Sequence, residues 1–211
     1  MLQAQDSRRV SLHGVSGVVM DVVGKIEALF QRRGSRPYED GAHGGITVLA
    51  HALQCAQLAE WAHADPALVA AALLHDLGQL MDAGEAEPLQ PDAHEQRGLA
   101  LLSTGFGSGV LEPIRLQPAA RRYLASMDAR QTPHLSPGAA HRLQQLGGRM
   151  NAEEGLMFLA RPQASAAVQL CRWDQLACHP GKRTPPLGYY LGQLEALLPS
   201  FRTGLARLAI A

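Results

Sequence analysis

Residues 71–80 read AALLHDLGQL, an apolar run that places a histidine and an aspartate, His75 and Asp76, side by side. The run predicts a helix that is buried on most of its surface. A buried carboxylate is costly unless it lies against a cation, several hydrogen-bond donors or a metal ion. The pair therefore predicts partners elsewhere in the chain, and the fold has to bring them to it.

The rest of the chain repeats a helical pattern of apolar residues, and runs that alternate as strands do are scarce. Asp65 is suited to cap a helix that begins with Pro66, and Gly147-Gly148 is suited to end one. The predicted helices are 15–33, 46–64, 67–76, 93–103, 110–127, a short helix before Gly147, one from about Asn151, 164–178 and 188–209. No internal repeat stands out, so the predicted fold class is all-α.

Composition narrows the class of protein. The chain has 211 residues, of which 46% are hydrophobic and 18% charged, which is typical of one soluble globular domain. Its formal net charge of zero argues against nucleic acid or a membrane surface as a partner. We expect a cytoplasmic protein, because no apolar stretch reaches the roughly 18 residues of a membrane span and no signal-peptide pattern opens the chain. The three cysteines are too widely spaced for a zinc–thiolate motif or a disulfide framework.

Four segments offer a histidine or a carboxylate at a position predicted to face inward: His51, the pair His75-Asp76, His94 and Asp174. Imidazoles and carboxylates that converge from rigid elements are the ligands that divalent first-row metals accept. For any one of these residues the alternative is a hydrogen-bonded side chain of the core. The residues alone leave both interpretations open.

The order His, His-Asp, Asp in this chain resembles the HD-domain superfamily, which is all-helical and binds divalent metals. Six segments make the resemblance more specific: HALQCAQLAE, AALLHDLGQL, HEQRGLALL, LQPAARRYLASMD, LQQLGGRMNAEE and RWDQLA. They occur in the order seen in HD-domain phosphonate oxygenases of the PhnZ type. The resemblance covers about residues 44–180 and implies one HD domain over 1–211, with an N-terminal and a C-terminal helix packed on that core.

What the resemblance implies is a mixed-valence di-iron oxygenase that uses dioxygen to cleave the carbon–phosphorus bond of a small hydroxyphosphonate. By this resemblance His51, His75 and Asp174 hold one iron, Asp76 bridges to the second, and His94 belongs to the second. Arg121 takes the place of a family lysine and supplies the positive charge that meets the phosphonate. The implied partners are a small anionic or zwitterionic substrate and dioxygen. Asp76, His94 and Arg121 are the implied catalytic residues.

The chain departs from the family at the second iron, where Gln117 stands in place of a histidine. A glutamine amide is a weaker ligand than imidazole, so the second ion is expected to be loose, replaced by another divalent metal, or absent. Gln117 is then a candidate substrate contact. For Arg121 and its neighbour Arg122, the alternative is a solvated helix face.

A second departure precedes His51, where the family tyrosine and glutamate fall on Gly41 and Gly44. Tyr38 and Glu39 lie close by and are candidates to cover the metal and contact substrate. The alternative for this segment is a surface turn.

Three functions stay open at this point. The first is the iron oxygenase acting on a phosphonate. The second is an HD-type phosphohydrolase, in which one metal activates water and His94 acts as acid or base. The third is a non-catalytic relative that keeps a single metal.

Overall fold

A computed structural model describes residues 13–38, 45–81, 93–127 and 137–198. Over these residues the chain is helical, apart from turns and one isolated antiparallel bridge between Pro37 and Thr47. The elements are α1 (His13–Arg33), α2 (Val48–Trp61), α3 (Pro66–Leu74), the 3-10 turn η1 (Leu77–Leu80), α4 (Ala93–Leu102), α5 (Ser108–Arg115), α6 (Gln117–Met127), α7 (Pro137–Gln145), α8 (Ala152–Leu159), α9 (Ala164–Leu176) and α10 (Leu187–Leu197). The predicted all-α class is confirmed.

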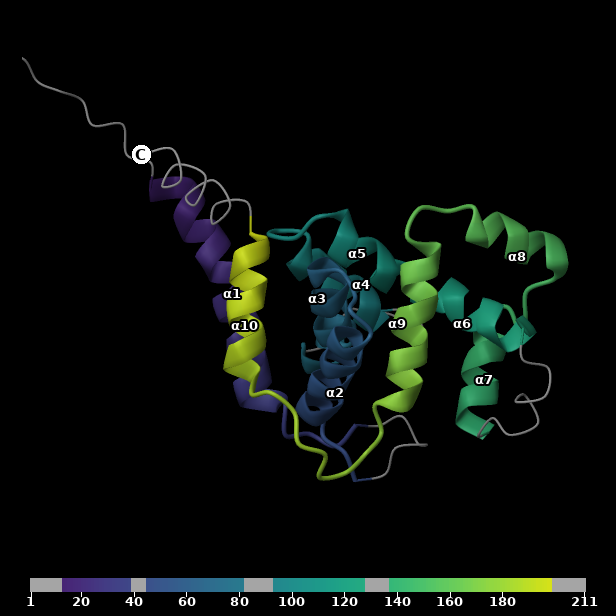
Figure 1. Ribbon diagram of the computed structural model, residues 1–211, viewed down its shortest axis with the longest axis horizontal. Helices are drawn as coiled ribbons and strands as arrows, with labels where there is room; N and C mark the ends of the chain where they lie inside the picture. The colour runs from purple at the N-terminus through teal and green to yellow at the C-terminus, as the bar shows by residue number, and fades with distance from the viewer. Residues whose placement is uncertain (1–12, 39–44, 82–92, 128–136, 199–211) are drawn as a thin grey trace, which may run out of the picture.

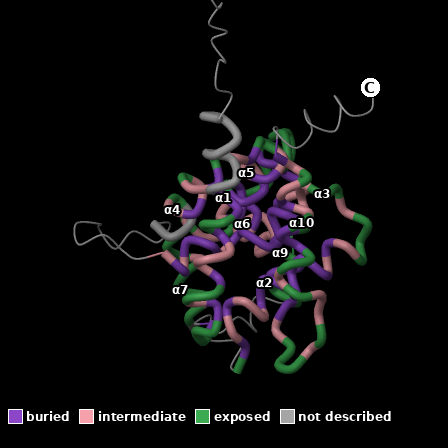
Figure 2. The backbone as a smooth tube through the Cα atoms, turned by 90° about the vertical axis from the view of Figure 1, so that its left-hand side faces the viewer, coloured by how far each residue is buried: buried purple, intermediate pink, exposed green. Residues whose placement is uncertain are grey.

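Helix α9 lies between two groups of helices (Figure 1). On one side a large hydrophobic core joins α2, α3 and α5 to the paired helices α1 and α10. On the other side a smaller core joins α6 and α8 to α9. Buried residues gather around α5, α6 and α9 in the middle of the molecule (Figure 2). Helices from both groups therefore pack against α9.

The helix that contains the first residues of AALLHDLGQL begins close to its predicted start and ends before its predicted end. The Asp65 side chain accepts a hydrogen bond from the Ala67 amide (2.8 Å), and Pro66 opens α3. The helix stops at Leu74, and Asp76 has φ −102° and ψ 13°, outside helical geometry. Neighbouring residues of a helix do not face one another. Because the chain leaves the helix at this point, the side chains of His75 and Asp76 reach the same place.

The predicted helix 110–127 is wrong, because the structure divides it into α5 and α6 at Leu116. Pro118 has no amide hydrogen to donate to the Ile114 carbonyl, so the helical ladder is interrupted there. The Leu116 amide still bonds to Glu112 (2.9 Å), and the Ala120 amide bonds to Leu116 (2.8 Å). A new helix therefore starts with Gln117.

The segment LQQLGGRMNAEE builds the turn between α7 and α8. Gly147 and Gly148 have φ of +96° and +72°, and they end α7 as predicted. Arg122 on α6 donates to the Gly148 carbonyl (2.9 Å) and to the Glu154 carboxylate (2.8 Å). Asn151 and Glu154 form a capping box at the start of α8. This segment therefore has a structural role, because its contacts with Arg122 hold α6 in place.

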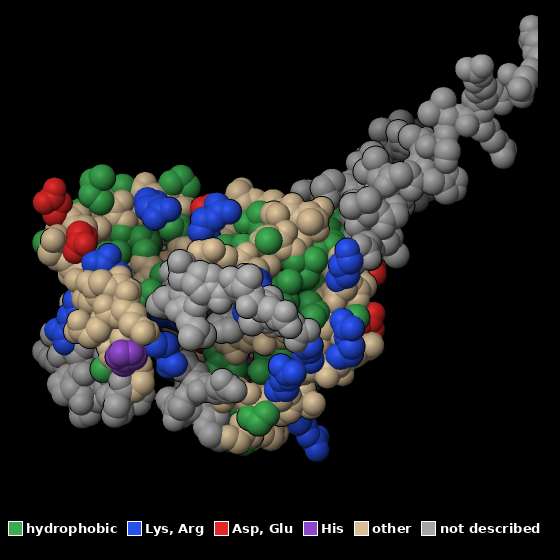
Figure 3. Space-filling model, turned by 180° about the vertical axis from the view of Figure 1, so that it is seen from behind, with side chains coloured by type: hydrophobic (Ala, Val, Ile, Leu, Met, Phe, Trp, Pro, Cys, Tyr) green, Lys and Arg blue, Asp and Glu red, His purple; other side chains and the backbone are tan. Residues whose placement is uncertain are grey.

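None of the described helices is both long enough and apolar enough to cross a membrane. Lys and Arg side chains are scattered over the face seen in Figure 3, and the described residues form no continuous basic patch there.

Candidate metal centre

Four side chains from α2, the α3–η1 junction and α9 converge on one point. Nε2 of His51 lies 3.4 Å from Nε2 of His75 and 3.3 Å from Oδ1 of Asp174. Nε2 of His75 lies 3.1 Å from Oδ2 of Asp76 and 3.6 Å from Oδ1 of Asp174. Both imidazoles are fully buried, and the two carboxylates are almost so. The structure brings together four of the five predicted metal ligands: His51, His75, Asp76 and Asp174.

Backbone carbonyls orient both imidazoles. Nδ1 of His51 lies 2.9 Å from the Ala177 carbonyl oxygen, and Nδ1 of His75 lies 2.9 Å from that of Ala72. A carbonyl oxygen only accepts, so each Nδ1 carries the hydrogen and each Nε2 of a neutral ring keeps a lone pair. A protonated ring instead donates from Nε2 to Asp76 or Asp174. In the neutral rings, two nitrogen lone pairs and two carboxylate oxygens face one another, and this donor set suits a divalent cation.

The charges of the cluster are strongly coupled. Burial by itself raises the pKa of both carboxylates, yet His75 brings the pKa of Asp76 down to about 2. Hydrogen bonds from His51 and His75, with the charge of Arg121, hold the pKa of Asp174 well below its usual value. Burial lowers the pKa of His75, but Asp76 and Asp174 outweigh it and raise that pKa well above its usual value. Both carboxylates are therefore ionised, and the positive charges of His75 and Arg121 lie against them.

Tyr38 covers one side of the cluster. Its hydroxyl donates to Oδ2 of Asp76 (2.5 Å), and its ring stacks on the imidazole of His51, with centroids 4.0 Å apart and 19° between the planes. The Tyr38 amide bonds to the Ile46 carbonyl (2.9 Å), which ties this segment to the start of α2. Burial and the charge of Asp76 raise the pKa of Tyr38 well above its usual value. The surface-turn alternative is wrong for Tyr38, which is 6% exposed.

Arg121 lies against the outer oxygen of Asp174. Its Nη2 donates to Oδ2 (3.1 Å), while Oδ1 of the same carboxylate faces the histidines. Arg122 turns away and binds the Gly148 carbonyl and Glu154. The alternative of a solvated helix face is therefore wrong for both arginines, and only Arg121 belongs to the cluster.

Gln117 lies one helical turn before Arg121 and is 0% exposed. Among the described residues, neither its amide oxygen nor its amide nitrogen has a hydrogen-bond partner. Its backbone carbonyl oxygen is 3.6 Å from Sγ of Cys171, one turn before Asp174 on α9. A buried polar atom left unpaired costs about 1–3 kcal/mol, so a buried amide without partners points to a group that binds there.

The structure does not describe the side chains of several predicted site residues. His94 is on α4, but its side chain lies outside the described residues, as do Glu39, Gly41 and Gly44. Helix α4 packs closely on η1. The approach is so close that a Cβ added at Gly98 would lie 3.1 Å from the Gly78 amide nitrogen. His94, one turn before Gly98, is therefore on a helix that runs beside the turn following Asp76.

The sequence interpretation missed one donor, Cys55. Its Sγ lies 3.5 Å from Nε2 of His51, one helical turn earlier, and the residue is fully buried. Burial, followed by the charges of Asp174 and Asp76, raises the pKa of this thiol well above its usual value. The i, i+4 spacing from His51 on one helix face was the available signal.

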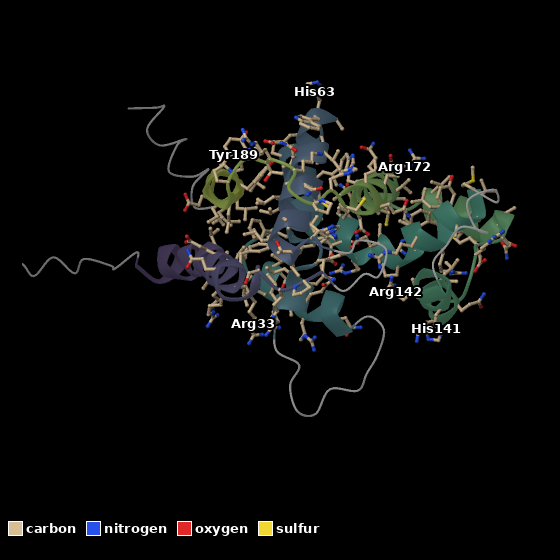
Figure 4. The ribbon with its side chains drawn as sticks, turned by 90° about the horizontal axis from the view of Figure 1, so that it is seen from below. Arg33, His63, His141, Arg142, Arg172 and Tyr189 are labelled. Atoms are coloured by element: carbon tan, nitrogen blue, oxygen red, sulfur yellow. The ribbon has the colours of Figure 1, made fainter. Side chains whose placement is uncertain are left out.

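Other polar residues lie apart from the cluster. His63, His141 and Arg172 extend from the periphery of the ribbon in Figure 4. Gln54 exchanges two hydrogen bonds with the backbone of His179 (2.8 and 3.1 Å), which ties the segment after α9 to α2.

Two curated proteins are similar to this chain over most of its length, and no family model matches it. The first is hydroxymethylphosphonate dioxygenase of Gimesia maris, which is 37% identical over 174 residues, covering 81% of this chain and 85% of the relative. The second is [1-hydroxy-2-(trimethylamino)ethyl]phosphonate dioxygenase (glycine-betaine-forming) of Leisingera caerulea, which is 26% identical over 181 residues, covering 84% and 91%.

Proposed function

The chain belongs to the family of phosphonate dioxygenases, and we propose that it cleaves the carbon–phosphorus bond of a small hydroxyphosphonate with dioxygen at a metal centre. The observation that carries the proposal is the buried set of two imidazole nitrogens and two carboxylates, all within 4.8 Å of one another. We further propose that residues 1–211 form one HD domain with a core of about 44–180, as the order of the motifs supports.

The proposed cofactor is iron, with His51, His75 and Asp174 as ligands of one ion and Asp76 as the bridge toward a second. The donor set fits, because both imidazoles have Nε2 turned inward by a backbone carbonyl bond. Bound iron supplies the electron transfer with dioxygen, which protein side chains cannot provide. The side chains fix the position of the ion and exclude water, since His51 and His75 are fully buried.

We propose that His94 and Gln117 border the second ion, which is held more weakly than the first. The fully buried amide of Gln117, which has no hydrogen-bond partner among the described residues, supports this position, because an ion or a substrate oxygen would satisfy it. An amide oxygen is a poorer ligand than imidazole for iron. The second ion is therefore expected to exchange readily, and other divalent metals are expected to compete for it.

The proposed substrate is a small phosphonate anion with a hydroxyl group, bound by Arg121. The guanidinium lies at Asp174, where it adds positive charge beside the metal position. Tyr38 is proposed to act as a cover, since a ligand at Oδ2 of Asp76 has to displace the hydroxyl of Tyr38. Glu39 is proposed as a further substrate contact.

A second candidate function is favoured by Gln117 itself. With only one metal, held by His51, His75, Asp76 and Asp174, the site would suit hydrolysis of a phosphate ester by a metal-activated water, with His94 as acid or base. Such an enzyme needs no redox metal and no dioxygen. A single-metal protein without turnover is the third possibility.

The test is release of phosphate by protein loaded with iron in the absence of air. Hydroxymethylphosphonate and [1-hydroxy-2-(trimethylamino)ethyl]phosphonate are supplied with and without dioxygen, and a phosphate monoester is the parallel substrate. Oxygen-dependent release from a phosphonate alone supports the oxygenase. Release from the monoester without dioxygen, sustained by manganese, contradicts it in favour of hydrolysis.

A further inference from the structure

A buried thiol adjoins the histidine pair. Cys55 lies one helical turn after His51 on α2, and its Sγ is 3.5 Å from Nε2 of that histidine. Both residues are 0% exposed, and His75 is 2% exposed. The thiol therefore faces the nitrogens that are proposed to bind metal, and not solvent.

The histidines belong to two overlapping sets of donors. One set is His51, His75, Asp76 and Asp174, and the other is His51, Cys55 and His75. Within each set, the donor atoms lie within 4.8 Å of one another. Each neutral Nε2 has a single lone pair, so the two sets cannot hold two separate ions at the same time.

We propose that His51, Cys55 and His75 form a second, mutually exclusive metal-binding mode of this site, which takes soft, thiolate-binding ions such as zinc. This inference rests on the proposed function, because it assumes that the histidine pair binds metal. Carboxylates suit harder ions, and thiolate with imidazole suits zinc. Spacing among the cysteines does not reveal such a site, because the partners of Cys55 are histidines.

The coordination step balances without an oxidant. As the metal–sulfur bond forms, the thiol releases its proton to water, so a thiol and a divalent ion give a metal thiolate and one proton. The oxidation states do not change. Zinc has no redox chemistry, so an ion held in this mode keeps the histidines from iron and blocks oxygen-dependent turnover until it is removed.

Cobalt(II) is the first probe, because its bond to a thiolate gives a near-ultraviolet charge-transfer band. We expect the band when cobalt is added to metal-free wild-type protein, and in Cys171→Ser, which changes another fully buried cysteine. We expect Cys55→Ser and Cys55→Ala to lose the band, and zinc affinity to fall by at least about tenfold relative to manganese. Circular dichroism checks that each variant is folded.

X-ray absorption at the zinc edge of the wild-type protein tests the inference without any variant. A sulfur neighbour at about 2.3 Å from zinc is expected. A shell of nitrogen and oxygen alone, or a cobalt band that persists in Cys55→Ser, overturns the proposal. Failure of the proposed function is distinguishable, because oxygen-dependent phosphate release is measured on the iron-loaded protein and does not depend on the zinc spectrum.

Discussion

Two sides of the site are built differently. On the side of the two histidines and Asp174, backbone carbonyls orient both imidazoles, and Arg121 reaches from α6 to contact Asp174. On the side of Gln117, a single buried amide has no hydrogen-bond partner among the described residues. The first side is held by several contacts that the helices impose, whereas the second depends on one side chain. We therefore expect the first side to hold a metal ion more tightly than the second.

The substitution Asp174→Asn, on the first side, is expected to have the largest effect on metal binding and activity. The change removes one negative charge from the cluster and weakens the contact with Arg121. We expect iron affinity to fall by at least about 100-fold, and phosphate release from the phosphonate to fall to background. Metal content after gel filtration checks the prediction. Asp65→Asn is the matched control, because asparagine caps a helix as well as aspartate does; unchanged iron content in Asp174→Asn would contradict the comparison.

Arg121→Gln is expected to affect substrate more than metal. The guanidinium is proposed to bind the phosphonate, and a hydrogen bond between charged groups contributes about 1.5–3 kcal/mol. We expect KM for the phosphonate to rise roughly 10- to 100-fold, with iron still bound. The neighbouring variant Arg122→Gln breaks the contacts with Gly148 and Glu154, so it should lower Tm and leave KM nearly unchanged. Equal KM changes in both variants would mean that Arg121 acts only through the fold.

The pH dependence of stability separates the metal-free from the metal-loaded cluster. The pKa of His75 is raised in the folded protein, so its contribution to stability is complete below about pH 6.5 and is lost as pH rises through the folded pKa. Asp76 and Asp174 have lowered pKa values, so their contribution is lost only in strong acid. We expect the free energy of unfolding of metal-free protein to decline above about pH 6.5.

A bound divalent ion replaces the proton of His75, so the metal-loaded protein should not show that decline. Urea unfolding over a pH series, with and without manganese, measures both curves. The exposed His141→Gln variant is the control and should keep the wild-type slope. Parallel curves for the two forms would show that no positive charge is needed between the carboxylates.

Tyr38→Phe is expected to have the smallest effect. It removes the hydrogen bond to Asp76 and keeps the ring on His51. The metal-free protein should lose about 1 kcal/mol of stability. Ligands that use Oδ2 of Asp76 should bind several-fold more tightly, because no hydroxyl has to be displaced. Calorimetric titration with manganese tests this, with Tyr189→Phe at the Glu60 contact as the control.

Much of the fold follows from local patterns in the sequence. Helical periodicity predicts the all-α class, and Asp65 and the Gly147-Gly148 pair mark real helix ends. The structure brings His51 next to the His75-Asp76 pair, as the order His, His-Asp, Asp along the chain and its family resemblance imply. The end of α3 at Leu74 does not follow from periodicity, since LLHDLG continues the apolar pattern.

Tertiary contacts account for what the sequence left open. Tyr38 turns inward because its backbone amide pairs with the Ile46 carbonyl, and no periodic pattern encodes such a contact. The break before Gln117 could be predicted from Pro118, because the missing amide hydrogen of this proline ends α5. The carbonyls of Ala72 and Ala177 orient the imidazoles, yet any residue supplies a carbonyl, so the sequence gives no sign of them.

The most direct measurement is iron per chain, by plasma mass spectrometry, after anaerobic loading and desalting. Wild type is compared with Gln117→His, which adds an imidazole, and with Gln117→Leu, which removes the amide. The contrast between the two sides predicts one tightly held iron in wild type and in Gln117→Leu, and two in Gln117→His. Two irons in wild type and one in Gln117→Leu would show that the amide is a competent ligand, and no iron in any of them would contradict the metal centre itself.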